Sequence, residues 1–431
     1  MKVLFVYPRF SRHAEAHPEL KQWVPLNEYL GSPSLGIAMI AGVTPDEVEI
    51  EFRDDRLESA ERPTDADLVA MSFFTPAASR AFELADYFRA LGKKVVAGGI
   101  FPTMMPEACA PHFDAVVVGE GEPVWPRVLA DFKRKALAPR YQADCAADVN
   151  ALPLPRVDLY LAQERPGSDF CPDDYPVQTS RGCPMSCVAC VLPTSMGSRL
   201  RAFPLQHILG QLQQLGRAGK KACLTEDTAW FPGATARAFE DLLDAVAVSG
   251  GADISYVGVS MPQVLAATPR LLGKAKAAGV DMVYLVGGFD PVTKRAFTGS
   301  DPKMLARAHA CIEKLHAAGI EPYTSFLIGN DDDDVGTVDR MLEFAEASGI
   351  RKAEFAVFTP YPGTPAWQNL RAEGRILDTR WSRYNDANVV FRPRRMTPDQ
   401  LTDSYLRLWR DFYRGKEHLK SLDRAERTIQ F

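Results

Sequence analysis

Three cysteines stand close together near the middle of the chain. Cys183, Cys187 and Cys190 have the spacing C-x3-C-x2-C. Three thiolates on one short segment can surround a compact soft-metal centre, which is the donor set that iron–sulfur clusters require. No fourth cysteine lies nearby. A cluster held here would therefore keep one iron open to an exogenous ligand, which indicates catalysis rather than a purely structural centre.

A structural zinc site and chance clustering are the alternatives. Structural zinc normally takes four protein ligands. The nearest downstream histidine is His207, inside a predicted helix. With 8 cysteines in 431 residues the chain is also too sparse in cysteine for a disulfide scaffold. The remaining ones are scattered and fit core or surface positions: Cys109, Cys145, Cys171, Cys223 and Cys311.

The cysteines directly follow the first strand of a predicted barrel. Residues 177–375 alternate apolar strand-like runs with helix-like segments, which predicts a partial (β/α)6 barrel of the TIM type. In such barrels the chemistry gathers where strands end and loops begin. The predicted strands are 177–180, 221–224, 254–259, 282–286, 323–328 and 353–358.

A second alternating array precedes the barrel. Residues 1–135 predict an α/β, doubly wound parallel sheet of the Rossmann-like type, with a ligand crevice at the carboxyl ends of its strands. Its predicted strands are 3–7, 48–52, 68–73, 94–97 and 115–118. Residues 136–176 are rich in proline and predict a linker, whereas residues 376–431 predict a small, mostly helical C-terminal segment.

Composition limits the class of partner. The chain has 46% hydrophobic and 24% charged residues and a net charge of −5, which is typical of a globular protein without an electrostatic preference for nucleic acid. The apolar run at the N-terminus is too short for a signal peptide. No run reaches the roughly 20 apolar residues of a membrane span. We expect a cytoplasmic protein with no nucleic-acid partner and no membrane span.

The cysteine spacing after a strand, at the start of a six-strand array, closely resembles the radical SAM superfamily. The resemblance implies a [4Fe-4S] cluster on Cys183, Cys187 and Cys190, whose open iron binds S-adenosylmethionine (SAM). It also implies a flavodoxin or ferredoxin-type electron donor. One position departs from the family: Ala189 stands where an aromatic residue usually precedes the last cysteine.

The resemblance continues at the ends of later barrel strands, where it implies contacts to SAM. Glu226 and Asp227 occupy the place of the family's acidic motif for the SAM amino group, although a helix cap is the alternative. Glycine at a strand end is also common for turn geometry alone. The other positions implied as SAM contacts are Ser260, Gly287, Leu327 and Gly329.

A doubly wound domain before such a barrel resembles the cobalamin (B12)-binding subfamily. The resemblance covers about residues 1–375 and implies corrin and nucleotide-tail contacts by Ser72, Phe73, Phe74, Thr75, Gly98, Gly99, Glu120 and Gly121. Glycine there admits close approach of a large ligand. The Asp-x-His-x-x-Gly motif of other cobalamin proteins is absent, as is usual in this subfamily. Phe101 stands where many relatives have histidine.

The resemblance implies a methyltransferase that acts on an unactivated carbon of a natural-product, lipid or tetrapyrrole precursor, through a 5′-deoxyadenosyl radical and methylcobalamin. A cyclisation, rearrangement or desaturation on the same two domains is the alternative. A non-catalytic sensor or carrier is disfavoured by the open iron. Three residues are candidates for tuning a substrate proton: Asp290, Tyr361 and Tyr384.

Overall fold

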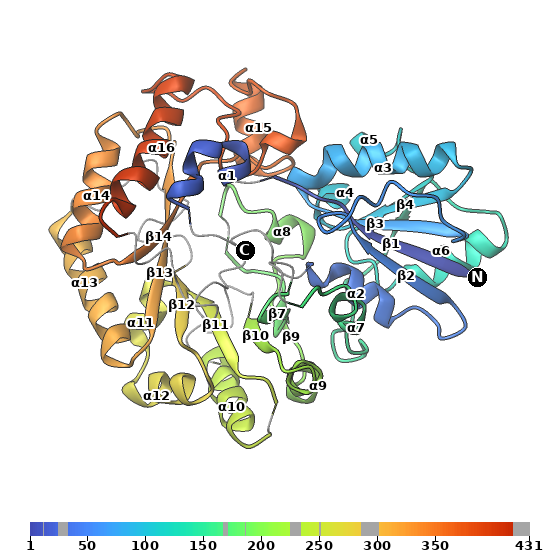
Figure 1. Ribbon diagram of the computed structural model, residues 1–431, viewed down its shortest axis with the longest axis horizontal. Coiled ribbons are helices and arrows are strands. Elements are labelled where there is room, and N and C mark those ends of the chain that lie inside the picture. Colours follow the sequence, from blue (N-terminus) through green and yellow to red (C-terminus); the bar gives the residue numbers. More distant parts are fainter. Residues whose placement is uncertain are drawn as a thin grey trace.

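The structure contains two six-stranded sheets of parallel strands, which lie side by side (Figure 1). The computed structural model describes residues 1–11, 13–24, 33–166, 171–185, 187–224, 234–249, 251–285 and 301–416. The first sheet is blue to cyan in the figure and the second runs from green to orange. The predicted fold class, a doubly wound domain followed by a partial barrel, is confirmed.

The first sheet has the strand order β2-β1-β3-β4-β5-β6, with every pair parallel. Its strands are rich in valine and other apolar residues because helices cover both faces. Helices α2 (Leu35–Gly42) and α6 (Trp125–Lys133) cover one face, and α3 (Ala78–Ala90), α4 (Ile100–Met104) and α5 (Pro106–Cys109) cover the other. The strands are β1 (Lys2–Tyr7), β2 (Glu49–Asp54), β3 (Leu68–Ser72), β4 (Lys94–Gly98), β5 (Ala115–Val118) and β6 (Arg140–Gln142).

Strand β6 extends this sheet into the segment that the sequence predicts as a linker. It pairs in parallel with β5, with Val117 opposite Tyr141. The Tyr141 ring is buried, and its hydroxyl donates to Asp131 in α6 at 2.9 Å. The proline-rich composition of residues 136–176 argues against a strand here. A short edge strand nevertheless forms, because it needs few ladder hydrogen bonds and tolerates proline beside it.

The second sheet is the partial barrel, with the parallel order β14-β13-β12-β11-β10-β7. Helices lie on its outer side (Figure 1): α9 (Leu205–Arg217), α10 (Ala234–Ser249), α11 (Met261–Ala266), α12 (Pro269–Ala277), α13 (Pro302–Ala317) and α14 (Thr337–Ala347). The strands are β7 (Asp174–Val177), β10 (Lys221–Leu224), β11 (Ile254–Val259), β12 (Met282–Leu285), β13 (Glu321–Ile328) and β14 (Lys352–Val357).

The first barrel strand begins three residues earlier than predicted. The sequence places it at 177–180, but β7 ends at Val177, and Ser180 and Arg181 form a separate short strand, β8. The earlier start was missed because Pro176 reads as a residue that central strands exclude. Strand β7 stands at the edge of the sheet, where proline is tolerated.

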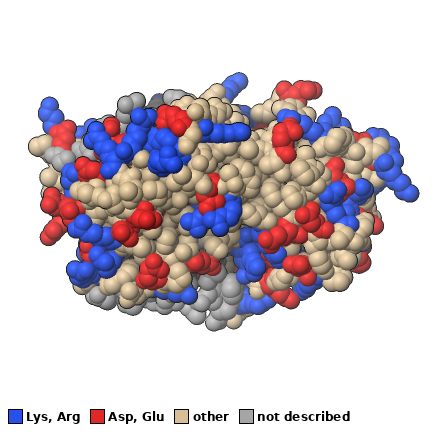
Figure 2. All heavy atoms as spheres, turned by 90° about the horizontal axis from the view of Figure 1, so that it is seen from above, with Lys and Arg blue, Asp and Glu red and all other residues tan. Residues whose placement is uncertain are grey.

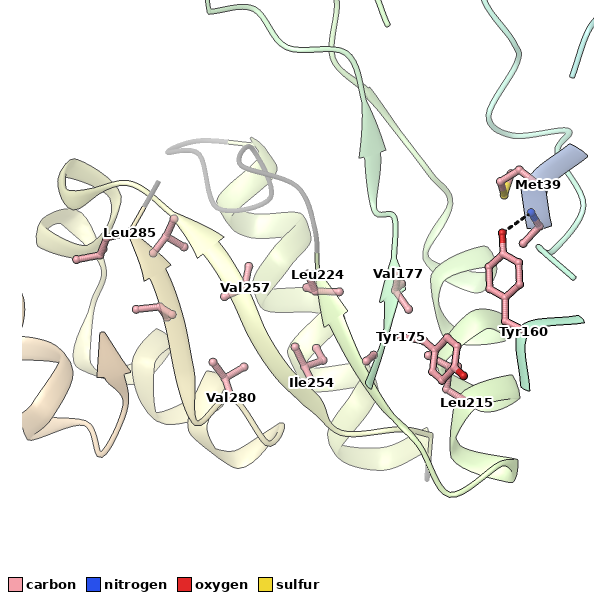
Figure 3. Packing of buried hydrophobic residues seen from close by; sticks show 14 of the residues in the cluster. Met39, Tyr160, Tyr175, Val177, Leu215, Leu224, Ile254, Val257, Val280 and Leu285 are labelled. Atoms are coloured by element: carbon pink, nitrogen blue, oxygen red, sulfur yellow. Dashed lines mark hydrogen bonds between the residues drawn. The ribbon is translucent and has the colours of Figure 1, made fainter. Parts of the chain in front are cut away.

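One hydrophobic core runs from the first sheet into the barrel (Figure 3). The segment between the sheets contributes Tyr160 to this core. The Tyr160 hydroxyl accepts from the backbone amide of Ala38 at 3.0 Å and donates to the carbonyl of Ser34 at 2.8 Å. Tyr175 and Leu215 continue the core beneath β7. The connecting segment is therefore packed between the domains and holds them together.

The C-terminal segment closes one side of the barrel. Helix α15 (Pro365–Ala372) is followed by η3 (Trp381–Arg383) and by α16 (Pro398–Tyr413), which packs on β14. The first loop of the chain reaches this segment. Asn385 donates to the carbonyl of Ser11 at 2.7 Å, and His17 Nε2 lies 2.7 Å from the carbonyl of Ala387.

Candidate active site

The three cysteines lie on one loop whose base is a small hairpin. Strand β8 (Ser180–Arg181) pairs antiparallel with β9 (Arg201–Ala202), and residues 182–200 form the loop between them. The Cys183 amide donates to the carbonyl of Gly197 at 3.1 Å. Gly182 has φ +83°, and a Cβ there would overlap the carbonyl oxygen of Arg199. Glycine is therefore required immediately before the first cysteine.

The cysteine loop fits an iron–sulfur cluster by its donor chemistry. Cys183 is buried, and Cys187 and Cys190 are half-buried. Within the described part of the chain no three Cys, His, Asp or Glu side chains converge as a ready metal site. The fit rests on three thiolates carried by one loop at the mouth of a barrel, the soft ligands and the location that such a cluster needs.

Two arginines at the base of the cysteine loop pair with two glutamates of the first domain. Arg201 donates to both carboxylate oxygens of Glu120, at 2.9 and 2.5 Å, and Arg181 donates to Glu122 at 2.6 Å. Arg181 also lies 3.5 Å from Glu120. The side chains of Arg181, Glu120 and Glu122 are only 5–6% exposed. We call these four residues the interdomain clamp.

The charges of the interdomain clamp act on Glu120. Burial raises the pKa of this carboxyl, but the hydrogen bond from Arg201 and the charge of Arg181 outweigh burial, so its pKa is lowered. Glu120 also accepts from the backbone of Ala147 at 2.6 Å. The sequence predicts Glu120 as a cobalamin contact. Its carboxylate is instead held by Arg201, Arg181 and Ala147, and this reduces what it can offer a ligand.

The inner face of the barrel is polar. Alternate residues along a strand face opposite sides, and the outward set joins the hydrophobic core, for example Val257 and Phe326. The inward set includes a pair that meets across one intervening strand, β13: the Tyr284 hydroxyl of β12 donates to Glu354 of β14 at 3.3 Å. Its other members include Cys223, Tyr256, Tyr323, Ser325 and Leu327.

Three predicted SAM contacts can be placed, and they differ. Leu327 is half-buried and lies on the inward face near the carboxyl end of β13. Ser260 follows β11 and opens α11, and its hydroxyl lies 2.8 Å from Gln263 Oε1 in a capping box. Gly329 has φ +109°, and a Cβ there would lie 3.0 Å from Leu401 of α16. The remaining predicted positions lie outside the described residues: Glu226, Asp227, Gly287 and the candidate Asp290.

The first domain has its crevice where the strand order reverses. Strands β2 and β3 flank β1, so connections leave the sheet on opposite faces there, and ligands of doubly wound folds bind outside such a point. Ser72 ends β3, and its Oγ lies 2.9 Å from where a Gly36 Cβ would be. Gly119 follows β5 with φ +81° and has open space around it. Close backbone approach and free space together fit a large ligand such as cobalamin.

The other predicted cobalamin positions divide between the crevice and the core. Phe74 is half-buried and contacts Phe10, whereas the Phe73 ring is buried and stacks on Phe101 at 6.0 Å. Thr75 is buried at the start of η2 (Thr75–Ala77). Phe101, which replaces a family histidine, is a core residue. Gly98, Gly99 and Gly121 lie at the ends of β4 and β5, and a Cβ on Gly121 would lie 2.8 Å from Ile40.

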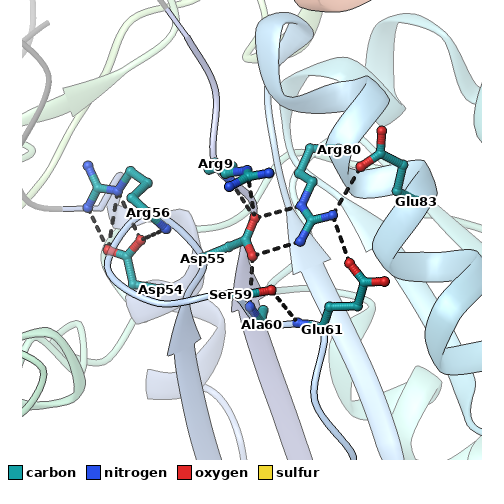
Figure 4. Close-up of polar contacts among 9 residues, drawn as sticks. All are labelled: Arg9, Asp54, Asp55, Arg56, Ser59, Ala60, Glu61, Arg80 and Glu83. Carbon is teal, nitrogen blue, oxygen red and sulfur yellow. Dashed lines mark hydrogen bonds and ion pairs between the residues drawn. The ribbon is translucent and has the colours of Figure 1, made fainter.

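An ion-pair cluster frames the β2 side of this crevice (Figure 4). The side chain of Asp55 is completely buried and accepts from Arg80 at 2.8 and 3.1 Å and from the backbone of Ala60 at 2.7 Å. Arg9, just after β1, lies beside the same carboxylate. These contacts fix the loops that follow β1 and β2.

The two candidate tyrosines have different surroundings. The Tyr361 hydroxyl donates to both carboxylate oxygens of Asp386 at 2.9 Å, in the loop after β14. Tyr384 is completely buried and donates to the carbonyl of Asp378 at 2.7 Å, and burial raises its pKa to about 12. Only Tyr361 is partly accessible to a ligand.

The loop after β14 touches both domains. A Cβ on Gly363 would lie 2.7 Å from Met104 Cε in α4, and the amide of Ala366 donates to Val188 in the cysteine loop at 3.0 Å. Helix α4 also contacts α8 (Leu192–Ser195). The cysteine loop, the carboxyl end of β4 and the last barrel loop therefore meet in one place.

Sequence reasoning missed the interdomain clamp and the inward tyrosines. Arg181 and Arg201 flank the cysteine loop closely enough to have been noticed, but their partners lie 59 and 81 residues away. The period-two pattern of β11 to β14 held a signal for the tyrosines, because each lies among apolar neighbours on an inward position.

Comparisons with known proteins agree with this geometry. Residues 29–129 match the family model of the B12 binding domain. The chain is 27% identical to a bacteriochlorophyllide d C-8(2)-methyltransferase of Chlorobaculum tepidum, over 89% of this chain and 86% of that one. It is 22% identical to a hopanoid C-2 methylase of Rhodopseudomonas palustris, over 95% and 76%.

A solved structure shares the fold. It is the radical SAM methyltransferase TsrM from Kitasatospora setae with cobalamin and a [4Fe-4S] cluster bound, with a TM-score of 0.62 and 15% identity over 86% of this chain and 78% of that one. A B12-binding domain followed by a partial barrel with a three-cysteine loop defines a class of radical SAM enzymes. The chain has the B12-binding domain, is similar over most of its length to named methyltransferases, and shares the fold of this class.

On the face shown in Figure 2, acidic and basic side chains are intermingled. Among the described helices none is both long and apolar enough to cross a bilayer.

Proposed function

We propose that the chain transfers a methyl group from SAM to an unactivated carbon of a small-molecule precursor. The observation that carries the proposal is the meeting of the cysteine loop, the carboxyl end of β4 and the last barrel loop at one site. Named relatives that match most of the chain are methyltransferases of tetrapyrrole and hopanoid substrates. This supports a tetrapyrrole, lipid or related natural-product precursor.

The residues of the chain divide into binding and shielding roles. Cys183, Cys187 and Cys190 would hold the cluster, and the open position after Gly119 would admit the corrin. When bound, the cluster supplies the electron that cleaves SAM, and cobalamin supplies the methyl group. The half-buried Leu327 would pack on the SAM adenosyl group and exclude water there.

The inward face of the barrel would orient the substrate. Tyr284 and Glu354 form a hydrogen-bonded pair at mid-depth, with Tyr323 beside it at 6.0 Å between ring centroids. Abstraction of hydrogen from carbon requires the target held at near-attack range. Tyr361, through Asp386, would hold or accept a substrate proton at its hydroxyl. Asp290 and Tyr384 remain weaker candidates for such a role.

The decisive experiment follows a labelled methyl group. Anaerobically reconstituted protein with hydroxocobalamin, dithionite and SAM labelled in its methyl group would be incubated separately with bacteriochlorophyllide d, a hopanoid and tryptophan. We expect 5′-deoxyadenosine, S-adenosylhomocysteine and one labelled product by mass spectrometry. The matched controls are Cys187→Ala, which should lose iron and all three products, and the exposed Cys145→Ala, which should keep them.

The same experiment tests the alternative, a radical reaction without methylation. A magnesium-protoporphyrin IX monomethyl ester cyclase of Cereibacter sphaeroides is 28% identical, but over only 26% of this chain. The production of 5′-deoxyadenosine without S-adenosylhomocysteine or labelled product would favour that alternative. Full activity of Cys187→Ala would contradict radical chemistry altogether.

The electron donor and the cellular location complete the proposal. A flavodoxin or ferredoxin-type protein would reduce the cluster, and the enzyme would work in the cytoplasm, where such donors and reduced thiols occur. Replacing dithionite by a flavodoxin system and measuring 5′-deoxyadenosine tests the donor.

A further inference from the structure

The interdomain clamp connects the proposed cobalamin crevice of the first domain to the cysteine loop of the barrel. Glu120 and Glu122 directly follow Gly119, at the carboxyl end of β5, where the crevice of the first domain opens. Arg181 stands two residues before Cys183, and Arg201 closes the same hairpin. The clamp is thus a short connection from the floor of the crevice to the base of the cysteine loop.

The contacts of the clamp are tight and directional. The fork of Arg201 meets both oxygens of Glu120, and the same two nitrogens also donate to backbone carbonyls, Nη1 to Ala147 at 2.9 Å and Nη2 to Met196 at 3.0 Å. Arg181 is fixed from another side by Gln178 at 3.0 Å and by the face of Phe203. Buried bidentate pairs of this kind set geometry more than they set stability.

A movement at one end of the clamp must reach the other. A ligand seated after β5 would lie against the segment that carries Glu120 and Glu122. The partners of these carboxylates cannot stay behind without leaving charges buried and unpaired, which is costly. Arg181 and Arg201 therefore carry the displacement to both arms of the cysteine loop, including Cys183.

We propose that Glu120, Glu122, Arg181 and Arg201 are positioning residues that couple occupancy of the cobalamin crevice to the geometry of the cysteine loop. This inference rests on the proposed function, because it assumes that both cofactors bind. It adds a regulatory consequence: the cluster reaches its working geometry only when cobalamin is in place, so the radical is not generated without its methyl carrier.

Coupling between two binding sites is reciprocal, which gives a measurement that does not use activity. The Kd of hydroxocobalamin would be measured by absorption titration on iron-free protein and on reconstituted protein. We expect the two Kd values of the wild type to differ by about 5-fold or more, the usual scale of such coupling. In Glu122→Gln the ratio should fall toward 1, because a neutral amide makes a weaker hydrogen bond to Arg181 and leaves the charge of this buried guanidinium with Glu120 alone.

The electron paramagnetic resonance spectrum of the reduced cluster gives a second readout. Adding hydroxocobalamin should change this spectrum in the wild type and leave it unchanged in Glu122→Gln. Arg201→Lys, which keeps the charge but loses the two-pronged contact, tests the same idea if Glu122→Gln unfolds. The matched control is Lys94→Gln, which removes an exposed ion pair with Asp114 in the same domain and should behave as wild type.

The outcomes separate this inference from the proposed function. Wild-type protein that binds no cobalamin at all would contradict both. Wild-type protein that binds it with equal Kd values in the two forms would overturn only the coupling. A ratio preserved in both Glu122→Gln and Arg201→Lys would likewise show that the clamp does not carry it.

Discussion

The Ser255 hydroxyl donates a 2.5 Å hydrogen bond to Oδ2 of Asp174, a carboxyl group that is completely buried at the start of β7. Its Oδ1 atom has no hydrogen-bond partner among the described residues. Burial raises the pKa of Asp174 to about 7, although the hydrogen bond from Ser255 lowers it. The first strand of the barrel therefore begins with a carboxyl group that resists ionisation.

This pKa predicts a stability that falls as pH rises. The folded state binds the proton up to about pH 7 and the unfolded state only to about pH 4, so stability declines across that window and the loss is complete above it. We expect Asp174→Asn to raise the melting temperature at pH 8, where ionisation costs on the order of 1.4 kcal/mol per unit of pKa shift. The gain should shrink toward zero near pH 4.

Thermal unfolding followed by circular dichroism at several pH values checks this prediction. The control is Glu107→Gln, which changes an exposed carboxylate of the first domain and should have little effect. A gain for Asp174→Asn that stays constant from pH 4 to pH 8 would contradict the assignment.

Two glycines in the cysteine loop form a matched pair. Gly182 and Gly197 have φ of +83° and +85°, so alanine is strained at both by about 1–2 kcal/mol. Only at Gly182 would the new Cβ overlap the Arg199 carbonyl. We expect Gly182→Ala to lose most of its iron and sulfide after reconstitution and Gly197→Ala to retain them. Equal iron content in the two variants would show that the base of the loop adapts.

A similar pair tests the cobalamin crevice. A Cβ on Gly99 would lie 2.8 Å from both the amide nitrogen and the carbonyl oxygen of Phe73, whereas one on Gly92 would meet nothing within 4 Å. Both glycines have positive φ. Gly99→Ala should therefore shift the end of β3 and weaken hydroxocobalamin binding, while Gly92→Ala should cost only backbone strain of about 1 kcal/mol. Absorption titration measures the affinity, and similar Kd values would refute the difference.

The candidate tyrosines can be separated by the pH dependence of 5′-deoxyadenosine formation. Tyr384→Phe removes a hydrogen bond to a backbone carbonyl and should lower stability by about 1 kcal/mol without changing the pH profile. Tyr361→Phe removes the hydroxyl that is shared between both oxygens of Asp386 and should shift the profile, because its proton no longer stabilises the charged carboxylate. Identical profiles for both variants would remove Tyr361 from the proposed mechanism.

Much of the fold could be predicted because its strands are short apolar runs that are followed by glycine, proline or polar residues. The ends of β5, β10 and β11 were correct to the residue. The start of β7 could not be predicted at Pro176, since sequence does not show which strand stands at the edge of a sheet. The three cysteines form a motif that is visible in the local sequence.

The interdomain clamp could not be predicted, because its contacts are long-range. Arg201 finds Glu120 only after two domains have packed together, and charged residues after strands are common on ordinary surfaces. Likewise, nothing local in the sequence shows that Phe73 turns into the core while Phe74 stays near the surface. Burial is a property of the assembled fold.

The contact between His17 and the carbonyl of Ala387 joins residues 370 positions apart. On the ribosome a chain emerges from its N-terminus, at about 5–20 residues per second. The first loop therefore meets this partner only after Ala387 has been translated, whereas all six strands of the first sheet have been made long before. The contact between the two ends of the described chain is thus a late event in its synthesis, and the first sheet can assemble without it.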